Sequence, residues 1–230
     1  MEVLETAHHV TQRGNARREV FETDSDRLVY LSLLRHHARQ AKLGILGYCL
    51  MPNHVHLIAI PHREDALRTA LRGAHGRYAA YLNARQARSG HVWQGRYYSC
   101  PMDEAHLWTA LRYAERNPVR AGMVRDPLDF AWSTARLHAG AGSDGFVELD
   151  DFQARWTSPE WCEFLAATAG EREAEALRRS TFRGRPLGSP DFIAGLEQAL
   201  ERPLLPRKGG RPKRAPTAVP ELADWLPAVG

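Results

Sequence analysis

The sequence contains few cysteines and no long apolar segment. Cys49, Cys100 and Cys162 are the only three cysteines among 230 residues, and an odd, widely spaced set supports neither a disulfide framework nor a structural zinc motif. No apolar run approaches the roughly 20 residues that a membrane-spanning helix needs. The N-terminal MEVLETAHHV also lacks the charged-then-apolar pattern of a secretory signal. We therefore expect a protein of the reducing cytoplasm that has no membrane partner.

Lysine is equally scarce, since it occurs only at Lys42, Lys208 and Lys213, and arginine supplies almost all of the positive charge. Arginine forks match phosphate oxygens and stack on bases, although a GC-rich genome also raises arginine content. The position of the charge favours nucleic acid, because Arg202–Arg214 holds six basic residues and no acidic one. Within it, GGRPKR resembles the core of an AT-hook, which binds a minor groove, but a solvated basic tail explains it equally well.

Hydrophobic periodicity and turn residues predict the order strand, helix, strand, strand, helix, strand, and then a third helix. This order is that of the split βαβ, ferredoxin-like fold, an α+β class with an antiparallel sheet and helices on one face. The strands are expected at 7–14, 43–50, 54–60 and 95–102, and the helices at 24–42, 63–86 and 103–116. In the first helix we expect an N-cap at Asp24 or Ser25 and an apolar stripe formed by Leu28, Leu31, Leu34 and Ala38.

The composition and the sequence pattern of the chain change after about residue 137. A glycine-rich loop is expected at 138–145, followed by helices at 171–180 and 188–202, the second with Ser189 as N-cap and Pro190 at its first position. The segment after Arg202 is rich in proline, glycine and arginine, so we expect it to stay disordered until a partner binds. We therefore divide the chain into a domain at 1–137, a helical C-terminal segment at 138–201 and a basic tail at 202–230.

Two histidines stand one residue apart in the predicted strand CLMPNHVHLIAIP. On a strand, His54 and His56 point to the same face, where two neutral imidazoles are able to share a metal ion. An isolated pair of this kind is more often two satisfied polar residues at a sheet face. In the third helix, Tyr113 and Asn117 lie four residues apart on one side. If that side packs against the histidines, three metal ligands and one nucleophile converge, although packing and helix termination are the simpler readings.

These segments resemble a known family. CLMPNHVHLIAIP is similar to the HUH motif, histidine–hydrophobic–histidine, of single-tyrosine DNA transposases, and LRYAERNPVRAGMV resembles the second signature of their REP-associated branch. HHVTQRGN, WQGRYYS and GRPLGSPDFIAGLEQAL also resemble blocks of that branch, so the resemblance extends over roughly residues 7–214. Related transposases outside the branch use a glutamine where Asn117 stands, and asparagine offers the same donor on a shorter arm.

The resemblance implies a metal-dependent transposase, with His54, His56 and Asn117 holding Mg²⁺ or Mn²⁺ and Tyr113 as the nucleophile. The Tyr113 oxygen would attack a phosphate of single-stranded or hairpin DNA, release a 3′-hydroxyl and form a 5′-phosphotyrosine link, which another 3′-hydroxyl then reverses. The resemblance also implies a substrate hairpin from REP palindromes. No general base for Tyr113 emerges from the residues, and we expect a nucleoid-associated monomer, with a dimer as the alternative.

Basic residues near the site and in the tail are the expected DNA contacts. Of Trp93, Tyr97 and Tyr98, which are able to stack on unpaired bases, we expect at least two to pack in the core instead. The candidates for gripping the DNA backbone are Arg13, Arg17, Arg18, Arg96, Arg120, Arg207, Lys208, Arg211, Lys213 and Arg214.

Two other function classes compete with a strand transferase. A DNA-binding regulator that kept the fold and lost the chemistry would not need His54, His56, Tyr113 and Asn117 together. A metal hydrolase acting on small molecules is disfavoured by the basic tail and by the lack of an aspartate or glutamate beside the histidines.

Overall fold

The computed structural model describes residues 2–142, 144–167 and 170–205, and its centre is a four-stranded sheet in the order β2-β3-β1-β4. Every neighbouring pair of strands is antiparallel. The expected ferredoxin-like α+β class and the order of its elements are confirmed. The strands are β1 (Ala7–Arg13), β2 (Leu43–Met51), β3 (His54–Pro61) and β4 (Tyr98–Met102).

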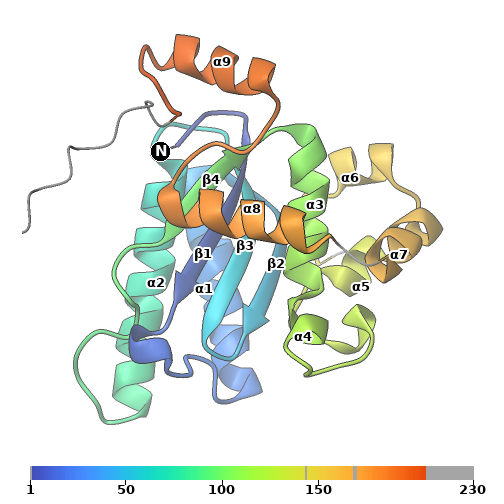
Figure 1. Ribbon diagram of the computed structural model, residues 1–230. Helices are drawn as coiled ribbons and strands as arrows, with labels where there is room; N and C mark the ends of the chain where they lie inside the picture. The colour runs from blue at the N-terminus through green and yellow to red at the C-terminus, as the bar shows by residue number, and fades with distance from the viewer. Residues whose placement is uncertain (1, 143, 168–169, 206–230) are drawn as a thin grey trace, which may run out of the picture.

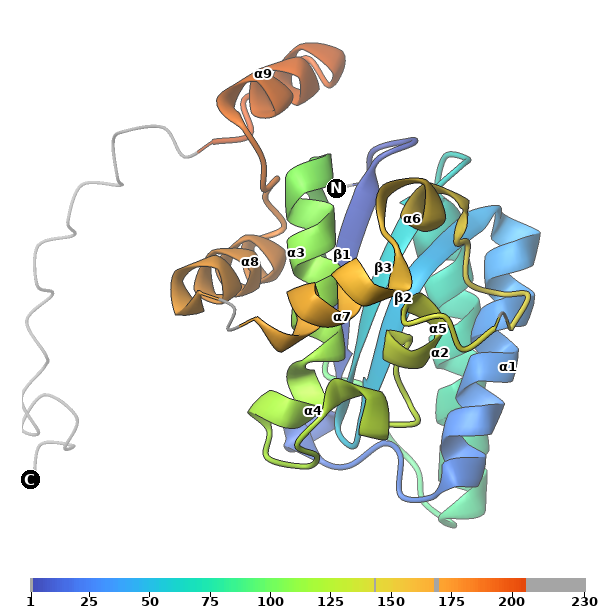
Figure 2. The same ribbon diagram turned by 90° about the vertical axis from the view of Figure 1, so that its right-hand side faces the viewer.

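Helices cover both faces of this sheet. The two helices of the ferredoxin-like unit, α1 (Asp24–Ala41) and α2 (Ala66–Arg85), lie on one face, while α3 (Glu104–Glu115) and α8 (Glu171–Arg183) lie on the other (Figures 1 and 2). Alternation along β3 explains the division, because Val55 and Leu57 belong to the α1–α2 core and Ile58 to the α3 core. The histidines of β3 therefore face α3 and α8.

Several short helices follow α3. The expected helices near the C-terminus are present as α8 and α9, and Ser189 caps α9 by accepting from the Phe192 amide. Helices α6 and α7 were not expected, because six and nine residues carry little periodicity, yet their Phe152 and Trp161 fill the α3 core. The bounds are η1 Asn15–Arg17, α4 Asn117–Arg120, η2 Pro127–Asp129, α5 Ala135–His138, α6 Asp150–Arg155, α7 Ser158–Ala166 and α9 Pro190–Ala199.

The basic tail lies mostly outside the described residues, which end at residue 205. Its predicted disorder and its five candidate DNA contacts therefore stay predictions, as does the division of the chain into three parts. The five contacts are Arg207, Lys208, Arg211, Lys213 and Arg214. In the described part of the chain, no helix is long and apolar enough to cross a membrane.

The start of α1 differs from the expectation. Thr23 is the N-cap, rather than Asp24 or Ser25, because its hydroxyl accepts from the Asp26 amide while the Asp26 carboxylate accepts from the Thr23 amide. The expected apolar stripe is also partly wrong, since Leu28 is 59% exposed. The side of the helix that faces the core carries Asp26, Tyr30, Leu34 and Ala38, which follow one another at four-residue spacing and are all fully buried. Leu28 lies away from this side and faces solvent.

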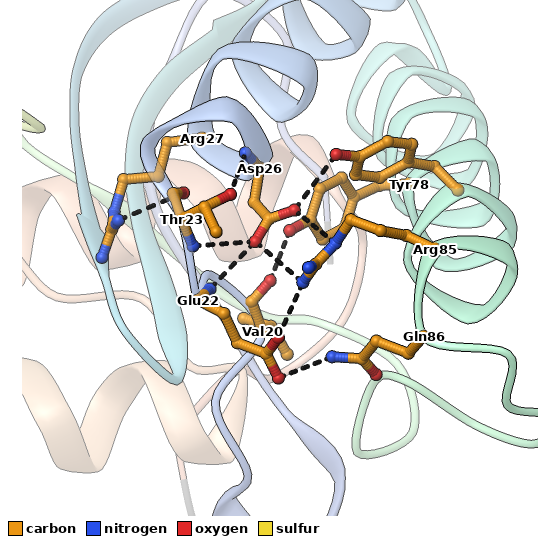
Figure 3. A network of polar contacts seen from close by, with 9 residues as sticks. Val20, Glu22, Thr23, Asp26, Arg27, Tyr78, Arg85 and Gln86 are labelled. Atoms are coloured by element: carbon orange, nitrogen blue, oxygen red, sulfur yellow. Dashed lines mark hydrogen bonds and ion pairs between the residues drawn. The ribbon is translucent and has the colours of Figure 1, made fainter.

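A polar network holds the segment after β1 against α1 and α2 (Figure 3). Arg85 of α2 pairs with both Asp26 and Glu22, and the Tyr78 hydroxyl donates to the Val20 carbonyl. The Val20 amide in turn donates to the carbonyl of Pro52, in the β2–β3 turn. This connection places the Arg13–Arg18 segment beside the turn from which His54 and His56 follow.

Gly47 allows α3 to approach the sheet closely. A Cβ atom at Gly47 would lie 2.4 Å from the Cδ2 of Leu111, which no real contact permits. The C-terminal end of α3 is held by the fully buried Glu115, whose carboxylate accepts from Thr134, His138 and Trp161. Tyr113 is thus carried by a helix that is fixed both against β2 and against the C-terminal segment.

Candidate active site

The candidate site begins with three imidazoles on one face of the sheet. His54 and His56 project together from β3, with ring centroids 4.9 Å apart and planes at 80°. β1 adds His9, because the register pairs Thr11 with His56 and so brings His9 diagonally beside it. The His9 and His56 rings stack with centroids 5.1 Å apart. The expected same-face placement of the histidine pair is thus observed, and a third histidine joins it.

Hydrogen bonds orient these rings through their Nδ1 atoms. His56 Nδ1 lies 2.8 Å from His9 Nε2, and His9 Nδ1 lies 2.7 Å from the Thr181 hydroxyl of α8. His54 Nδ1 lies 2.7 Å from the side-chain oxygen of Asn53, to which it donates. Nε2 therefore remains available on His54 and on His56 within the described part of the chain. Metal-binding histidines are commonly oriented in this way by partners on the opposite ring nitrogen.

Burial keeps all three imidazoles neutral. Burial, followed by the positive charges of Arg13 and Arg120, lowers the pKa of His54 to about 4. Burial lowers the pKa of His9 to about 3. The pKa of His56 is lowered well below its ordinary value by burial and then by the neighbouring His54 and His9. At neutral pH each ring thus keeps a nitrogen lone pair, which is the form that binds a metal.

Tyr113 of α3 faces the imidazoles edge-on. Its ring centroid lies 5.6 Å from that of His56 and 6.0 Å from that of His9. The Arg120 guanidinium lies 4.4 Å from the centre of the Tyr113 ring. The pKa of Arg178 of α8 is raised, first by its hydrogen bond to Glu171 and also by its interaction with the Tyr113 phenol. Two cationic side chains therefore surround a tyrosine that is only 6% exposed.

Asn117 lies close to Tyr113 but not in the same helix. Helix α3 ends at Glu115, and Asn117 begins α4, where its side-chain amide donates to the Tyr113 carbonyl at 3.2 Å. Its oxygen accepts from Arg120 at 2.5 Å. Asn117 is 2% exposed and is not among the described residues that line the cavity containing the histidines, whereas Arg120 is.

One cavity of about 450 Å³ joins the parts of the site. It contains four arginines, and among the described residues that line it there is no aspartate or glutamate. A larger hollow of about 630 Å³, beside Lys42 and Glu148, contains none of the predicted site residues. The cavity is lined by His9, Thr11, Arg13, Arg17, His54, His56, Gln94, Tyr98, Tyr113, Arg120, Arg178, Thr181 and Phe182.

The predicted DNA contacts separate into two groups. Arg13, Arg17 and Arg120 line the cavity, and Arg96 lines a separate hollow of about 650 Å³ that shares Tyr98 and Phe182 with it. Arg18 instead donates to the His91 carbonyl and is not part of that lining.

Of the three aromatic candidates, Trp93 and Tyr97 pack against the α1–α2 core, in line with the expectation for at least two of them. Tyr98 is 39% exposed and lines the cavity.

Six lining residues were not predicted; besides Thr11 and Gln94, four bear on the site: His9, Arg178, Thr181 and Phe182. His9 and Thr11 share one face of β1, a strand that the sequence predicts. Only the register between β1 and β3 shows that His9 lies beside His56. The other three come from α8, and nothing local in the sequence says that this helix lies across β4 and β1.

The donor set partly fits a divalent metal. His54 and His56 offer two neutral nitrogens, which suit Mn²⁺ or Zn²⁺ better than Mg²⁺. The Asn117 oxygen is held by Arg120, so it becomes a ligand only when that guanidinium turns away. In the described residues, no group of three or more histidine, cysteine, aspartate or glutamate side chains is arranged to hold a metal ion. A metal here would keep open positions, as catalytic sites require.

The arrangement of an imidazole pair and a helical tyrosine on this fold agrees with the family comparison. The model of the family described as "Transposase IS200 like" matches residues 2–117. The chain belongs to the IS200-like transposase family. The matched region contains His9, His54, His56, Tyr113 and Asn117, but it ends before α8, which supplies Arg178, Thr181 and Phe182.

One solved structure supports the fold. A REP-associated tyrosine transposase bound to a REP hairpin aligns with a TM-score of 0.50 and 19% identity, over 68% of this chain and 88% of that one. A candidate transposase from Deinococcus radiodurans aligns with a TM-score of 0.36 and 20% identity, over 50% of this chain and 92% of that one, which is too distant to carry an argument.

One curated relative has a different name. A Polynucleobacter asymbioticus protein named peptidyl-tRNA hydrolase is 28% identical over 94 residues, which is 41% of this chain and 45% of that protein. The match thus spans less than half of the length of that relative, and it adds no function to this chain.

Proposed function

We propose that this transposase breaks and rejoins one strand of hairpin DNA through a covalent link to Tyr113. The observation that supports this most is the shared cavity, in which a buried tyrosine faces two oriented, neutral imidazoles and four arginines. A pure DNA-binding regulator needs the arginines, but it gains nothing from burying three histidines, each of which costs free energy to desolvate. A strand transferase needs all of these groups together.

The arginines position the scissile phosphate. Arg13 and Arg17 lie on the β1 side of the cavity, and Arg120 and Arg178 lie on the Tyr113 side. Guanidinium forks bind phosphate oxygens in pairs, so groups on two sides hold the phosphate in line with the phenol. This positioning converts an encounter in solution into attack within one complex.

Tyr113 then acts as the nucleophile. Its oxygen loses a proton and forms a bond to phosphorus, while the bond from phosphorus to the deoxyribose 3′-oxygen breaks and that oxygen takes up a proton. The products are a 5′-phosphotyrosine and a free 3′-hydroxyl. Arg120 and Arg178 stabilise the negative charge on the phenol oxygen as its proton leaves. No water enters the step, so attack by another 3′-hydroxyl on the phosphotyrosine regenerates the phenol and joins a new strand.

His54 and His56 would hold a divalent ion through Nε2, with Asn117 as a third ligand once Arg120 turns toward DNA. The chemistry such an ion would supply is withdrawal of charge from a phosphate oxygen, which would favour attack at phosphorus. Asn53 and the His9–Thr181 pair fix the two rings for this purpose.

A REP-like hairpin is the proposed substrate. Support comes from the sequence blocks shared with the REP-associated branch and from the fold similarity to a transposase solved with a REP hairpin. A hairpin presents a phosphate between unpaired nucleotides at its foot, which suits attack by a largely buried tyrosine that lines a cavity. The monomeric state expected from the sequence stays a prediction, which size-exclusion chromatography with and without DNA checks.

The test is a covalent-adduct assay. Incubation with a labelled hairpin and Mg²⁺ or Mn²⁺ is expected to give a protein–DNA adduct that survives denaturing electrophoresis. Tyr113→Phe should abolish the adduct and retain hairpin affinity, since it removes only the hydroxyl. Tyr97→Phe is the matched control, because Tyr97 lies outside the cavity lining and packs against the core.

Three results would contradict the proposal. An adduct that persists in Tyr113→Phe would move the nucleophile elsewhere. DNA cutting that is undiminished by excess chelator would show that the reaction needs no metal. Tight hairpin binding without any adduct would favour the regulator that has lost the chemistry.

A further inference from the structure

The most exposed aromatic side chain of the described residues stands at the edge of the candidate site. Phe182 of α8 is 67% exposed, and its ring packs on that of Tyr98, with centroids 4.9 Å apart and planes at 33°. A phenylalanine in water is unfavourable in proportion to its apolar area, and the two adjoining exposed rings form a contiguous apolar patch, the kind of surface that marks binding sites when it is large. Leu28 is nearly as exposed, but it lies on α1, on the other side of the sheet.

Phe182 and Tyr98 form a ridge between two hollows. Both residues line the cavity of the histidines, and both also line a second hollow of about 650 Å³. Phe182 directly follows Thr181, whose hydroxyl lies 2.7 Å from His9. The ridge is therefore one residue away, along α8, from the group that orients the histidines, and a chain leaving the cavity on this side has to cross it.

Positive charge lies on both sides of the ridge. The cavity of the histidines contributes four arginines. The second hollow contributes Arg68, Arg96 and Arg183 against two acids, and Arg68 is already paired with Asp65 at 2.6 Å. Within the described part of the chain, neither Arg96 nor Arg183 forms an ion pair. A flat apolar surface between two groups of arginines matches a nucleotide, which has an aromatic face and a phosphate on each side.

We propose that Phe182 and Tyr98 form a stacking platform for one unpaired base of the strand that continues past the scissile phosphate. The flanking phosphates then face the cavity arginines on one side and Arg96 and Arg183 on the other. This inference rests on the proposed function and adds a second DNA site to it. It also gives the C-terminal segment a role in selecting substrates, because α8 supplies Phe182.

Binding of three DNAs to the full chain tests the platform: a hairpin without a flank, and the same hairpin with a four-nucleotide flank on its 5′ or 3′ side. For wild type, one flank should strengthen binding. Phe182→Ala should reduce binding of that flanked hairpin about tenfold and leave the blunt hairpin unchanged, because one stacked base is lost. Phe182→Trp should restore the affinity. Leu28→Ala, an exposed residue on the other face, should change neither.

A fluorescent base in the flank gives a second, direct measurement. 2-Aminopurine is quenched when it stacks, so one position in the flank should lose fluorescence on binding to wild type and Phe182→Trp but not to Phe182→Ala. Since the Phe182 side chain is largely exposed, the alanine variant should fold as the wild type does.

Equal losses for blunt and flanked hairpins, or no loss at all, would overturn the platform. A concentration-dependent dimer that Phe182→Ala abolishes would assign the ridge to a second copy of the chain instead, and it would also overturn the platform. These results differ from failure of the proposed function, in which wild type would form no adduct with any of the three DNAs.

Discussion

The two faces of the sheet meet different physical demands, and β3 contributes to both. On the α1–α2 face, Val55 and Leu57 are fully buried in an apolar core. On the α3–α8 face, the alternate residues His54 and His56 are polar, and each has a hydrogen-bond partner on its Nδ1 atom. One strand thus carries stability on one side and chemistry on the other, because successive side chains point in opposite directions.

The two faces of the sheet are also covered by different parts of the chain. Apolar side chains pack without directional partners, so local helices such as α1 and α2 suffice to cover them. Buried imidazoles need donors and acceptors in defined places, and here Asn53 and Thr181 supply them from a turn and from a distant helix. The chemical face therefore depends on a segment far away in sequence.

The largest effect is expected from a substitution on the α3–α8 face of the sheet, which should impair DNA cleavage far more than stability. His56→Ala should reduce DNA cleavage by more than about 100-fold, since loss of a ligand costs more than loss of a ligand's orienting partner. It should change the free energy of unfolding by only about 1 kcal/mol, the cost of leaving the Nε2 atom of His9 without a partner. Adduct formation and urea unfolding measure the two effects. Unfolding as severe as that of a core mutant would contradict the division.

The neighbouring residue should behave in the opposite way. Leu57→Ala, on the other face of the same strand, should lower the free energy of unfolding by about 2–5 kcal/mol through the cavity it leaves. Cleavage per folded molecule should remain near that of wild type at a temperature where the variant is folded. A specific loss of cleavage in a fully folded Leu57→Ala would mean that the faces are not independent.

A smaller effect is expected from the link between α8 and the histidines. Thr181→Val keeps the shape and removes the hydroxyl that orients His9, which in turn orients His56, so affinity for Mn²⁺ should fall by up to about tenfold, the lower end of the effect of losing a ligand's direct partner. Calorimetric titration with Mn²⁺, without DNA, measures this. Thr181→Ser, which retains the hydroxyl, is the matched control and should bind as wild type does. Equal Mn²⁺ affinity in the Thr181→Val and Thr181→Ser variants would show that the Thr181 hydroxyl does not affect metal binding.

The smallest effect on DNA cleavage is expected on the α1–α2 face, where a change in pH alters stability alone. Burial lowers the pKa of His75 to about 3, and its ring lies 3.0 Å from the Tyr30 hydroxyl. Below pH 6.5 the unfolded chain binds a proton at this residue and the folded chain does not, so stability falls as the pH is lowered. His75 should contribute about 1.4 kcal/mol per pH unit between pH 6.5 and 4.5. His75→Gln should make the stability curve shallower by that amount, and identical slopes would contradict the assignment.

Most features that depend on neighbouring residues were predictable from the sequence, and features that depend on distant residues were not. The β2–β3 hairpin is local, since its alternating pattern and its Pro52–Asn53 turn lie within 20 residues, and it was predicted with nearly the observed bounds. The N-cap of α1 was placed one or two residues late, because Thr23 is selected by a reciprocal bond with Asp26 rather than by its own propensity. The position of Asn117 depends on how α3 ends, and Arg120 decides what its oxygen contacts.

The sequence by itself determined the order of the elements, the face on which His54 and His56 lie and the helical placement of Tyr113, because strand and helix periodicities are properties of neighbouring residues. Only the tertiary structure decided that His9 stacks on His56, that Arg120 holds Asn117 and that α8 completes the site. Those contacts depend on strand register and on the packing of a helix whose residues lie more than 50 positions beyond Tyr113. No local periodicity records such an arrangement.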